Sequence, residues 1–334
     1  MNNLIAVTIG DINGIGLELL LKLFKNKKIK NFVLFSNIYL FKQYLKKNNI
    51  KIKLNIINTT AKNFEFKKNF LNIYNFKSSS FEDNTLKSIK ISHKHCINNN
   101  FIGMVTLPIR KDLIINSVMK SFIGHTEYLQ KLEKKKYSNM ILYHKKIIIS
   151  PLTTHIKLKS VSKKLTNKYL INQVSNLDKT LKKDLNIKNP KIIISGINPH
   201  AGENGKIGNE EEKIIKPIIK KLKRKNIIIE GPYSADSVLI NANIKKYDCF
   251  LFIYHDQALI PFKFISKFSG VNFTGNLNVI RTSPDHGTAY NLKGSNNVSD
   301  ISLKNCFYLI NKIYKNRITY DKSKKITKSK LFNR

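Results

Sequence analysis

The sequence predicts an α/β protein built on a largely parallel sheet. Three observations lead to this prediction: short apolar runs recur along the 334 residues, amphipathic stretches separate many of them, and several runs end in loops that contain Gly, Asp or His. Strands that alternate with helices favour parallel pairing, because each return to the same edge of a sheet needs a crossover. A parallel sheet is buried on both faces, which fits runs that are continuously apolar.

The first element shows the pattern. Leu4–Thr8 is an apolar run, and the turn-forming pair Gly10-Asp11 comes soon after it. Apolar residues at helical spacing follow, at Ile15, Leu19, Leu20 and Leu23. The chain is therefore expected to open as a strand, a glycine turn and a helix.

The same pattern repeats along the chain. Further runs that indicate short buried strands are Phe32–Phe35, Lys51–Ile57, Phe101–Thr106, Ile147–Ile149, Lys191–Ser195, Ile227–Ile229 and Phe250–Tyr254. Amphipathic segments that predict helices include Thr85–Ile97, Thr166–Leu185 and Glu210–Lys223. From Lys315 onward the chain is polar and basic without periodicity, so we expect regular structure to end there.

Composition predicts a cytoplasmic protein with a substantial core. The chain is 42% hydrophobic and long enough for two ordinary domains or one large one. Its three cysteines, Cys96, Cys249 and Cys306, form no CxxC pair, which argues against a disulfide framework and a cysteine zinc site. The first residues lack the pattern of a signal peptide, and no run of about 18 apolar residues is free of charge. We therefore expect no membrane partner.

The formal charge of +39 suggests nucleic-acid binding, but the distribution of the charge weakens this interpretation. Nearly all the cations are Lys, only five residues are Arg, and the Lys are spread through every segment. Arg is the residue that reads bases and holds phosphate in a bidentate way. We expect solvated Lys-rich faces that attract anionic small molecules, and no nucleic-acid partner. A basic binding module remains the alternative, and it predicts salt-sensitive binding that does not depend on the histidines.

Three histidines lie in loops that follow predicted strands: His155, His200 and His255. Ligands of open α/β sheets bind where the strands end, so these imidazoles could meet there. A His₃ set with open coordination positions is typical of a catalytic metal site. The alternative is that each is a hydrogen-bonded polar loop residue. His93 and His95 differ, because residues two apart on a helix point away from each other, and we expect both on a solvated face.

A dense polar cluster occupies residues 281–289, RTSPDHGTA. It combines a turn former, a carboxylate, an imidazole and a glycine that permits close backbone approach, which suits a polar cofactor or a structured surface loop. The turn GDINGIG at residues 10–16 lacks GxGxxG spacing, and the sequence contains no GxxxxGK loop, so a nucleotide site would be of a non-Rossmann type. The glycines at 202, 205 and 208 predict either a capped helix start or a mobile loop over a site.

Eight motifs occur together in the order found in one enzyme family. They are GDINGIGLE near the start, TLPIRK at 106–111, GHTEY at 124–128, TTH ending at His155, GINPHAGENGKIGNEE from Gly196, GPYSAD from Gly231, YHDQALIPFK from Tyr254 and RTSPDHGTA from Arg281. On these motifs the chain resembles the 4-hydroxythreonine-4-phosphate dehydrogenases of vitamin B6 synthesis. The resemblance covers roughly residues 4 to 316.

The resemblance implies a fold like that of the isocitrate and isopropylmalate dehydrogenases, with two α/β/α domains and a cleft between them. The expected first domain comprises residues 1–127 and 300–334 and holds both termini. The expected second domain, residues 128–299, carries the metal histidines and the interface of a homodimer. The active site would be shared, with His155 and His200 from one chain and His255 from the other.

The resemblance also implies roles for individual residues. The metal ligands, for Zn, Mg, Mn or Co, would be His155, His200 and His255. Substrate contacts would come from His125, Thr126, Lys263, Asn272 and Arg281. Catalytic proton transfer would fall to Asp236 or Lys263. Contacts to NAD or NADP would come from Asp285, His286, Gly287, Thr288 and Asn291.

The sequence departs from the family pattern at several positions. Ile12 and Leu17 replace prolines, Leu107 and Arg110 replace the common Gly and His, and Ala258 stands where a Gly usually follows YHDQ. Asn291 occupies the position of the acidic residue expected to meet the cofactor ribose, and LKGS follows it in place of an AGKG-like stretch. The choice between NAD and NADP therefore stays open.

The implied reaction is oxidation of 4-phosphohydroxy-L-threonine, followed by decarboxylation to 3-amino-2-oxopropyl phosphate. A sister activity on a phosphorylated four-carbon sugar acid, phosphoerythronate or phosphothreonate, would use the same metal and cofactor residues and is the main alternative. A metal hydrolase is a third possibility, and it would not need the loop at 285–288.

Overall fold

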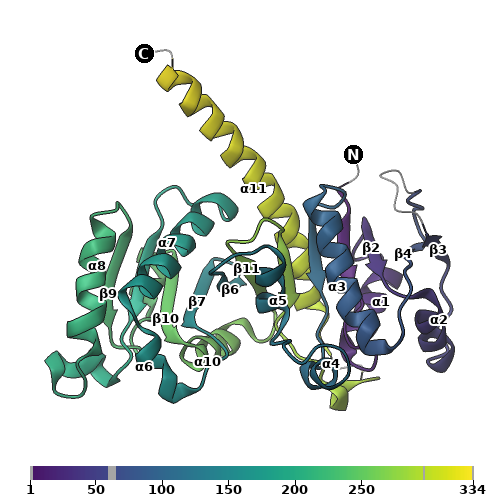
Figure 1. The fold of residues 1–334 in the computed structure, drawn as a ribbon, viewed down its shortest axis with the longest axis horizontal. Helices are drawn as coiled ribbons and strands as arrows, with labels where there is room; N and C mark the ends of the chain where they lie inside the picture. Colours follow the sequence, from purple (N-terminus) through teal and green to yellow (C-terminus); the bar gives the residue numbers. More distant parts are fainter. Residues whose placement is uncertain (1–2, 59–64, 296–297, 333–334) are drawn as a thin grey trace. The chain divides into compact units, whose positions relative to one another are not determined.

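The computed structural model describes residues 3–58, 65–295 and 298–332, and the chain divides into two compact units (Figure 1). The first unit comprises Met1–Lys134 and Leu277–Tyr314, and the second comprises Lys135–Asn276 and Lys315–Arg334. The boundaries expected from the sequence placed residues 277–299 in the second domain. The structure groups them with the first unit, because the strand at 281–284 pairs with a strand of that unit.

The first unit is a parallel sheet with helical connections. Its strands are β1 (Ile5–Thr8), β2 (Phe32–Phe35), β3 (Leu54–Ile57), β4 (Leu71–Tyr74), β5 (Gly103–Thr106) and β12 (Arg281–Pro284), in the order β3-β4-β2-β1-β5-β12. Its helices are α1 (Ile15–Lys25), α2 (Ile38–Lys47), α3 (Phe81–Ile97), α4 (Lys111–Ser117), α5 (His125–Leu132), the 3-10 turn η4 (Tyr290–Leu292) and the first part of α11 (Ile301–Phe332). Helix α3 packs on β1, β2 and β5. Buried apolar side chains such as Phe35, Ile89 and Met104 form the core.

The second unit has one antiparallel strand in an otherwise parallel sheet. Its strands are β6 (Asn139–His144), β7 (Ile147–Thr153), β8 (Lys191–Ser195), β9 (Ile228–Tyr233), β10 (Cys249–Tyr254) and β11 (Val271–Gly275), in the order β11-β6-β7-β10-β8-β9. Its helices are η1 (Leu158–Ser160), α6 (Val161–Lys164), α7 (Asn167–Asp184), η2 (Pro199–Gly205), η3 (Glu211–Ile215), α8 (Lys216–Lys223), α9 (Asn241–Lys246) and α10 (His255–Ser266). Helix α10 packs on β7 and β10, and α8 packs on β9.

Local signals explain where the helices begin. The side chain of Ser80 accepts a hydrogen bond from the backbone N–H of Asp83 at 3.1 Å, which caps α3. Thr166 caps α7 in the same way. In α1, Glu18 lies in the first turn and Lys22 and Lys25 in the last, which complements the helix dipole. The α/β prediction is confirmed.

The tail differs from the sequence-based expectation, because α11 continues from Ile301 to Phe332 instead of ending near Lys315. Contacts to the end of α7 account for its continuation. Asn316 donates to the carbonyl of Asp184 at 2.8 Å, and Arg317 Nε donates to the Asp184 carboxylate at 2.7 Å. A second nitrogen of Arg317 lies 3.3 Å from the other carboxylate oxygen, so the ion pair is bidentate.

This ion pair gives a stability prediction. Arg317→Ala is expected to lower the free energy of unfolding by about 3–5 kcal/mol, because it leaves a buried carboxylate without its cation. Asp184 is 2% exposed. Urea denaturation would measure the loss, with Arg224→Ala, an exposed arginine at the end of α8, as the matched control at about 0.5 kcal/mol or less. Equal small losses in the two variants would contradict the prediction.

Cys96, Cys249 and Cys306 are all buried and unpaired with one another. Burial raises the pKa of each thiol.

Within the described ranges, no helix has both the length and the apolar character required to cross a bilayer.

Candidate functional site

The candidate metal ligands lie at the carboxyl ends of neighbouring strands in the second unit. Strands β7, β10, β8 and β9 lie side by side, and the chain beyond them carries His155, His255, His200 and Asp236 respectively. Because these strands are parallel, the four loops emerge at the same edge of the sheet. The sequence-based expectation that the histidine loops share a strand edge agrees with this arrangement.

His155 and His255 lie next to each other. Tyr254 of β10 aligns with Thr153 of β7, so the residues just beyond them are neighbours, and the ring centroids of the two histidines are 5.6 Å apart. The Nδ1 atom of His255 lies 2.7 Å from a carboxylate oxygen of Asp256. A carboxylate at one ring nitrogen orients an imidazole and leaves Nε2 for a ligand, as in many metal sites.

His200 lies on a separate turn of unusual conformation. Residues 200–204 all have positive φ, from 43° to 78°, so the backbone there is left-handed. This turn lies close to Asp236, whose pKa is lowered first by a hydrogen bond from Ser234 and also by the nearby His200. Asp236 is therefore ionised near neutral pH.

The three histidines do not form one cluster within the described residues, where no group of three His, Cys, Asp or Glu is close enough to hold a metal ion. The chain instead places His155 with His255, whereas the expected shared site paired His155 with His200. The physical reason is strand order: β7 and β10 are direct neighbours, and β8 lies on the far side of β10.

Lys263 and Asn272 are also in the second unit, but not at the histidine edge. Lys263 lies in α10 two turns beyond His255, with Nζ 4.9 Å from the centre of the Phe268 ring. Asn272 of β11 pairs with Leu142 of β6, and Leu142 in turn pairs with Ile149 of β7. Ile149 lies about 13 Å before the end of β7, so Asn272 is far from the strand end that carries His155. The Oδ1 atom of Asn272 is buried and has no hydrogen-bond partner in the part of the chain that the structure describes.

The first unit holds a cationic cluster around Arg281 of β12. Arg281 is 3% exposed, its Nε donates to Thr106 Oγ1 at 2.9 Å, and its Nη1 lies 3.5 Å from Thr126 Oγ1. Pairing of β12 with β5 brings Arg281 next to the end of β5, and α5 begins at His125 and Thr126. Three of the five predicted substrate residues are therefore in one cluster.

The cluster has the electrostatics of an anion site. Burial lowers the pKa of Arg281 to about 10, so it is a cation at neutral pH. The pKa of His125 is held well below its usual range, first by burial and then by Arg281 and Lys111. The neutral ring has a buried Nε2 with no hydrogen-bond partner within the described ranges. A desolvated cation beside an unsatisfied ring nitrogen suits an anionic ligand with hydrogen-bonding oxygens.

The loop beyond β12 carries the five predicted cofactor residues and folds against the turn after β1. Asp285 N donates to Ser302 Oγ at 2.8 Å, and the carbonyl of Thr288 accepts from Ile15 N, the first residue of α1, at 2.9 Å. A Cβ on Gly14 would lie 3.0 Å from that carbonyl oxygen, so the glycine permits the approach. A Cβ on Gly287 would meet no described atom within 4 Å, and Asn291 is exposed. This side of the loop is therefore open to a ligand.

Comparison with known proteins gives this chain a family. A sequence model described as pyridoxal phosphate biosynthetic protein PdxA matches residues 28–310. This chain belongs to that family. The 4-hydroxythreonine-4-phosphate dehydrogenase of Sulfurihydrogenibium sp. is 37% identical over 306 residues, which cover 87% of this chain and 92% of that protein. The enzyme of the same name from Bacteroides thetaiotaomicron is 33% identical over 94% of this chain and 89% of its own length.

A solved PdxA-family structure has the same fold. The 4-hydroxythreonine-4-phosphate dehydrogenase of Klebsiella pneumoniae superposes with a TM-score of 0.79 at 27% identity, covering 93% of this chain and 99% of that one. The predicted family and the predicted enzyme class, an oxidoreductase of pyridoxal phosphate biosynthesis, are therefore confirmed.

The His200 turn is supported by Glu211, a role that no sequence pattern indicated. Glu211 is fully buried, and its Oε1 accepts from the backbone N–H groups of Ile197 at 2.8 Å and Asn198 at 2.9 Å. A Cβ on Gly202 would lie 2.6 Å from Glu211 Oε2. The glycines of this segment thus serve close packing around a buried carboxylate. The three glutamates at 210–212 were visible in the sequence, but their spacing to His200 carried no signal.

Gln257 was also missed as a supporting residue. Its Oε1 accepts from Ser195 Oγ at 3.1 Å and from Ile253 N at 2.9 Å, and its Nε2 donates to the carbonyl of Gly196 at 3.0 Å. This side chain therefore joins the end of β8 to the start of α10, and so fixes two of the histidine loops to each other.

The expectation that His93 and His95 face solvent is wrong. They are 7% and 8% exposed. His93 Nε2 lies 3.3 Å from Glu133, and His95 Nδ1 lies 3.0 Å from the Asn100 amide. The ring of His95 also packs edge-on against Tyr74. Both histidines are buried in the first unit, where hydrogen bonds satisfy their ring nitrogens.

If His200 is a metal ligand, Glu211→Ala is expected to weaken metal binding by about 10- to 100-fold, the range seen when a supporting partner of a ligand is lost, because two backbone N–H groups beside His200 lose their acceptor. Equilibrium metal titration with a competing chelator would measure the effect. Glu212→Ala is the matched control, since the Glu212 side chain pairs with Lys216 instead. Equal affinities in the two variants would show that Glu211 does not position His200.

Proposed function

We propose that the chain is a metal-dependent, NAD- or NADP-linked dehydrogenase of 4-phosphohydroxy-L-threonine. The product, 2-amino-3-oxo-4-phosphooxybutanoate, would lose CO₂ to give 3-amino-2-oxopropyl phosphate. The observation that carries the proposal is the buried cluster of Arg281 and neutral His125, since a buried cation beside an unsatisfied imidazole nitrogen suits an anionic ligand. Membership of the PdxA family and the names of its relatives supply the substrate.

The residues present fit a divalent ion in their chemistry. His155 and His255 are adjacent imidazoles at strand ends, and Asp256 orients one of them. A bound Zn, Mg, Mn or Co ion would supply Lewis acidity, which lowers the pKa of a secondary alcohol and eases hydride removal. The third imidazole, His200, would come from the second subunit of a homodimer, which would account for the described residues of one chain bringing only His155 and His255 together.

The other side chains would bind and orient the substrate. Arg281, His125 and Thr126 would hold an anionic group of the substrate, its phosphate or its carboxylate. Lys263 and Asn272 are the further substrate contacts that the family resemblance implies. Holding the substrate in one orientation would favour hydride transfer from its secondary alcohol.

Proton transfer has two candidates. Asp236 is ionised, so its carboxylate can accept a proton, although its lowered pKa makes it a weak base. Lys263 is the second candidate. The loop of Asp285, His286, Gly287 and Thr288, with Asn291 after it, would contact the adenosine end of NAD or NADP. The expected cytoplasmic location stays a prediction.

Substrate identity is tested by product analysis. The enzyme is incubated with metal, NAD and NADP, and equal concentrations of 4-phosphohydroxy-L-threonine, 4-phosphoerythronate or 4-phosphothreonate. We expect release of CO₂ and 3-amino-2-oxopropyl phosphate from the amino acid, at a kcat/KM at least about tenfold above the sugar acids, because one lost contact to a charged group is worth about 1.5–3 kcal/mol. Faster oxidation of a sugar acid would assign the sister activity instead.

A further inference from the structure

Side-chain hydrogen bonds, in addition to a backbone hydrogen bond, join the predicted cofactor loop to the segment that follows β1. Besides the bond from Ile15 N to the carbonyl of Thr288, Gly294 N donates to the Glu18 carboxylate at 3.1 Å. Between these two points, the hydroxyl of Tyr290 donates to the carboxylate of Asp11. Three contacts along 288–294 therefore hold the loop, one to the turn after β1 and two to the start of α1.

Tyr290 is the side chain that makes the central contact. It lies in η4, is 38% exposed, and its ring lies 5.7 Å from the guanidinium carbon of Arg110. Arg110 is held in turn by Asp112, with Nε donating to Oδ1 at 2.9 Å. The phenol thus lies between a carboxylate that accepts its hydrogen bond and a cation that lies over its ring.

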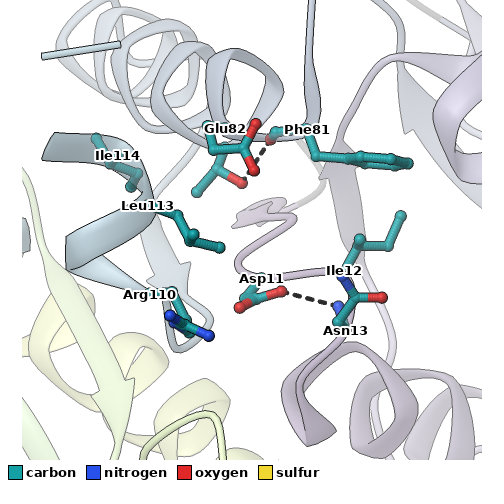
Figure 2. Close-up of a pocket in the computed structure, with 9 residues that line it drawn as sticks. Asp11, Ile12, Asn13, Phe81, Glu82, Arg110, Leu113 and Ile114 are labelled. Carbon is teal, nitrogen blue, oxygen red and sulfur yellow. Dashed lines mark hydrogen bonds between the residues drawn. The ribbon is translucent and has the colours of Figure 1, made fainter. Parts of the chain in front are cut away.

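Asp11 is itself fixed. Its Oδ1 accepts from Asn13 N at 2.9 Å, and its backbone N–H donates to the carbonyl of Pro108 at 2.8 Å. Gly10, with φ of +65°, brings this turn against β5, where a Cβ would lie 2.6 Å from that of Leu107. Figure 2 shows Asp11 and Arg110 on one side of a small pocket of about 50 Å³, with Phe81 and Glu82 of α3 opposite. A rigid turn thus presents the carboxylate to the loop.

We propose that Tyr290 and Asp11 form a latch that holds the loop at 285–294 in its cofactor-binding shape before the dinucleotide arrives. Tyr290 is a positioning residue, which needs no contact with the cofactor. The inference rests on the proposed function, because the loop is assigned to NAD or NADP there. A loop that is already ordered loses less conformational entropy on binding, so the latch would raise cofactor affinity without adding a contact.

The test measures loop order and cofactor affinity in the same variants of the full chain. Tyr290→Phe removes the donor, Asp11→Asn removes the charged acceptor, and the double variant closes a mutant cycle. Tyr308→Phe is the matched control, since Tyr308 lies on α11 and is 64% exposed. Amide hydrogen exchange of the ligand-free protein reports the loop, and fluorescence titration with NADH and NADPH reports the affinity.

We expect faster exchange confined to 285–294 and roughly tenfold weaker binding of the preferred dinucleotide in each single variant, the factor that corresponds to about 1.4 kcal/mol. The double variant should be no weaker than either single one. The KM for the phosphorylated substrate should stay at its wild-type value, which separates a latch from a general loss of structure.

Three outcomes would overturn the latch: unchanged exchange in Tyr290→Phe, additive losses in the double variant, or weaker binding in Asp11→Asn alone. The last would mean that Asp11 meets the dinucleotide directly. A wild-type protein that binds neither NADH nor NADPH would refute the proposed function, and the exchange data would still decide whether Tyr290 and Asp11 order the loop.

Discussion

Alanine at His155, His200 or His255 is expected to lower kcat/KM by more than about a hundredfold, because each change removes a ligand of the ion that acidifies the substrate alcohol. The fold should be retained, since each histidine lies just beyond the end of a strand and outside the buried core of the sheet. Metal content by mass spectrometry should fall in parallel with activity. Near wild-type turnover in any of the three variants would remove that histidine from the metal site.

Mixing the inactive variants tests how the ligands are divided between subunits. If one chain supplies His155 and His255 and its partner supplies His200, a mixed dimer of His155→Ala and His200→Ala has one complete site. Random exchange makes about half the dimers mixed, so activity should recover to roughly a quarter of wild type. Mixtures of His155→Ala with His255→Ala should stay inactive, because both sites then lack one ligand.

The opposite pattern would contradict this division. Recovery only in the mixture of His155→Ala with His255→Ala would mean that these two ligands come from different chains, despite their ring separation of 5.6 Å in one chain. If no mixture recovers, although tagged subunits are shown to exchange, all three ligands come from one chain.

Arg281→Ala is expected to raise the KM for the phosphorylated substrate by about 10- to 150-fold, which corresponds to the loss of about 1.5–3 kcal/mol from one charged hydrogen-bonding partner. The KM for the dinucleotide should change much less. Steady-state kinetics with each substrate varied in turn would measure both, and Arg281→Lys should recover part of the loss, because it keeps the charge without the bidentate geometry.

A structural loss must be separated from a binding loss in this variant, because Arg281 is buried and bonded to Thr106. Thermal unfolding in the presence and absence of inorganic phosphate does so: phosphate should stabilise the wild type and have a smaller effect on Arg281→Ala. An equal rise of both KM values would place Arg281 at the dinucleotide instead.

Much of the fold was predictable, because most strands are continuous apolar runs. Four strands were not predicted: β4, β6, β11 and β12. Strand β12 has the sequence RTSP, and it is buried because Arg281 bonds to Thr106 on the neighbouring strand, a pairing that local composition does not encode. The helical tail was missed for a similar reason, since Arg317 is fixed by a carboxylate 133 positions away.

The site was predictable only as a set of residue types. The loops of His155, His200 and His255 follow predicted strands, and this much came from the sequence. Which two histidines are neighbours depends on strand order, and the order β7-β10-β8 is not sequential. The supporting residue Glu211 and the contact between Tyr290 and Asp11, 279 positions apart, depend on chain folding in the same way.

The most direct test of the whole account is the rate of nicotinamide reduction by purified enzyme with 4-phosphohydroxy-L-threonine, before and after removal of divalent metal. Chelation should abolish turnover, and added Zn, Mg, Mn or Co should restore it. No turnover is expected when either the phosphorylated amino acid or the dinucleotide is omitted. Full activity in rigorously metal-free enzyme, or no reduction of either NAD or NADP with metal present, would contradict the proposed function.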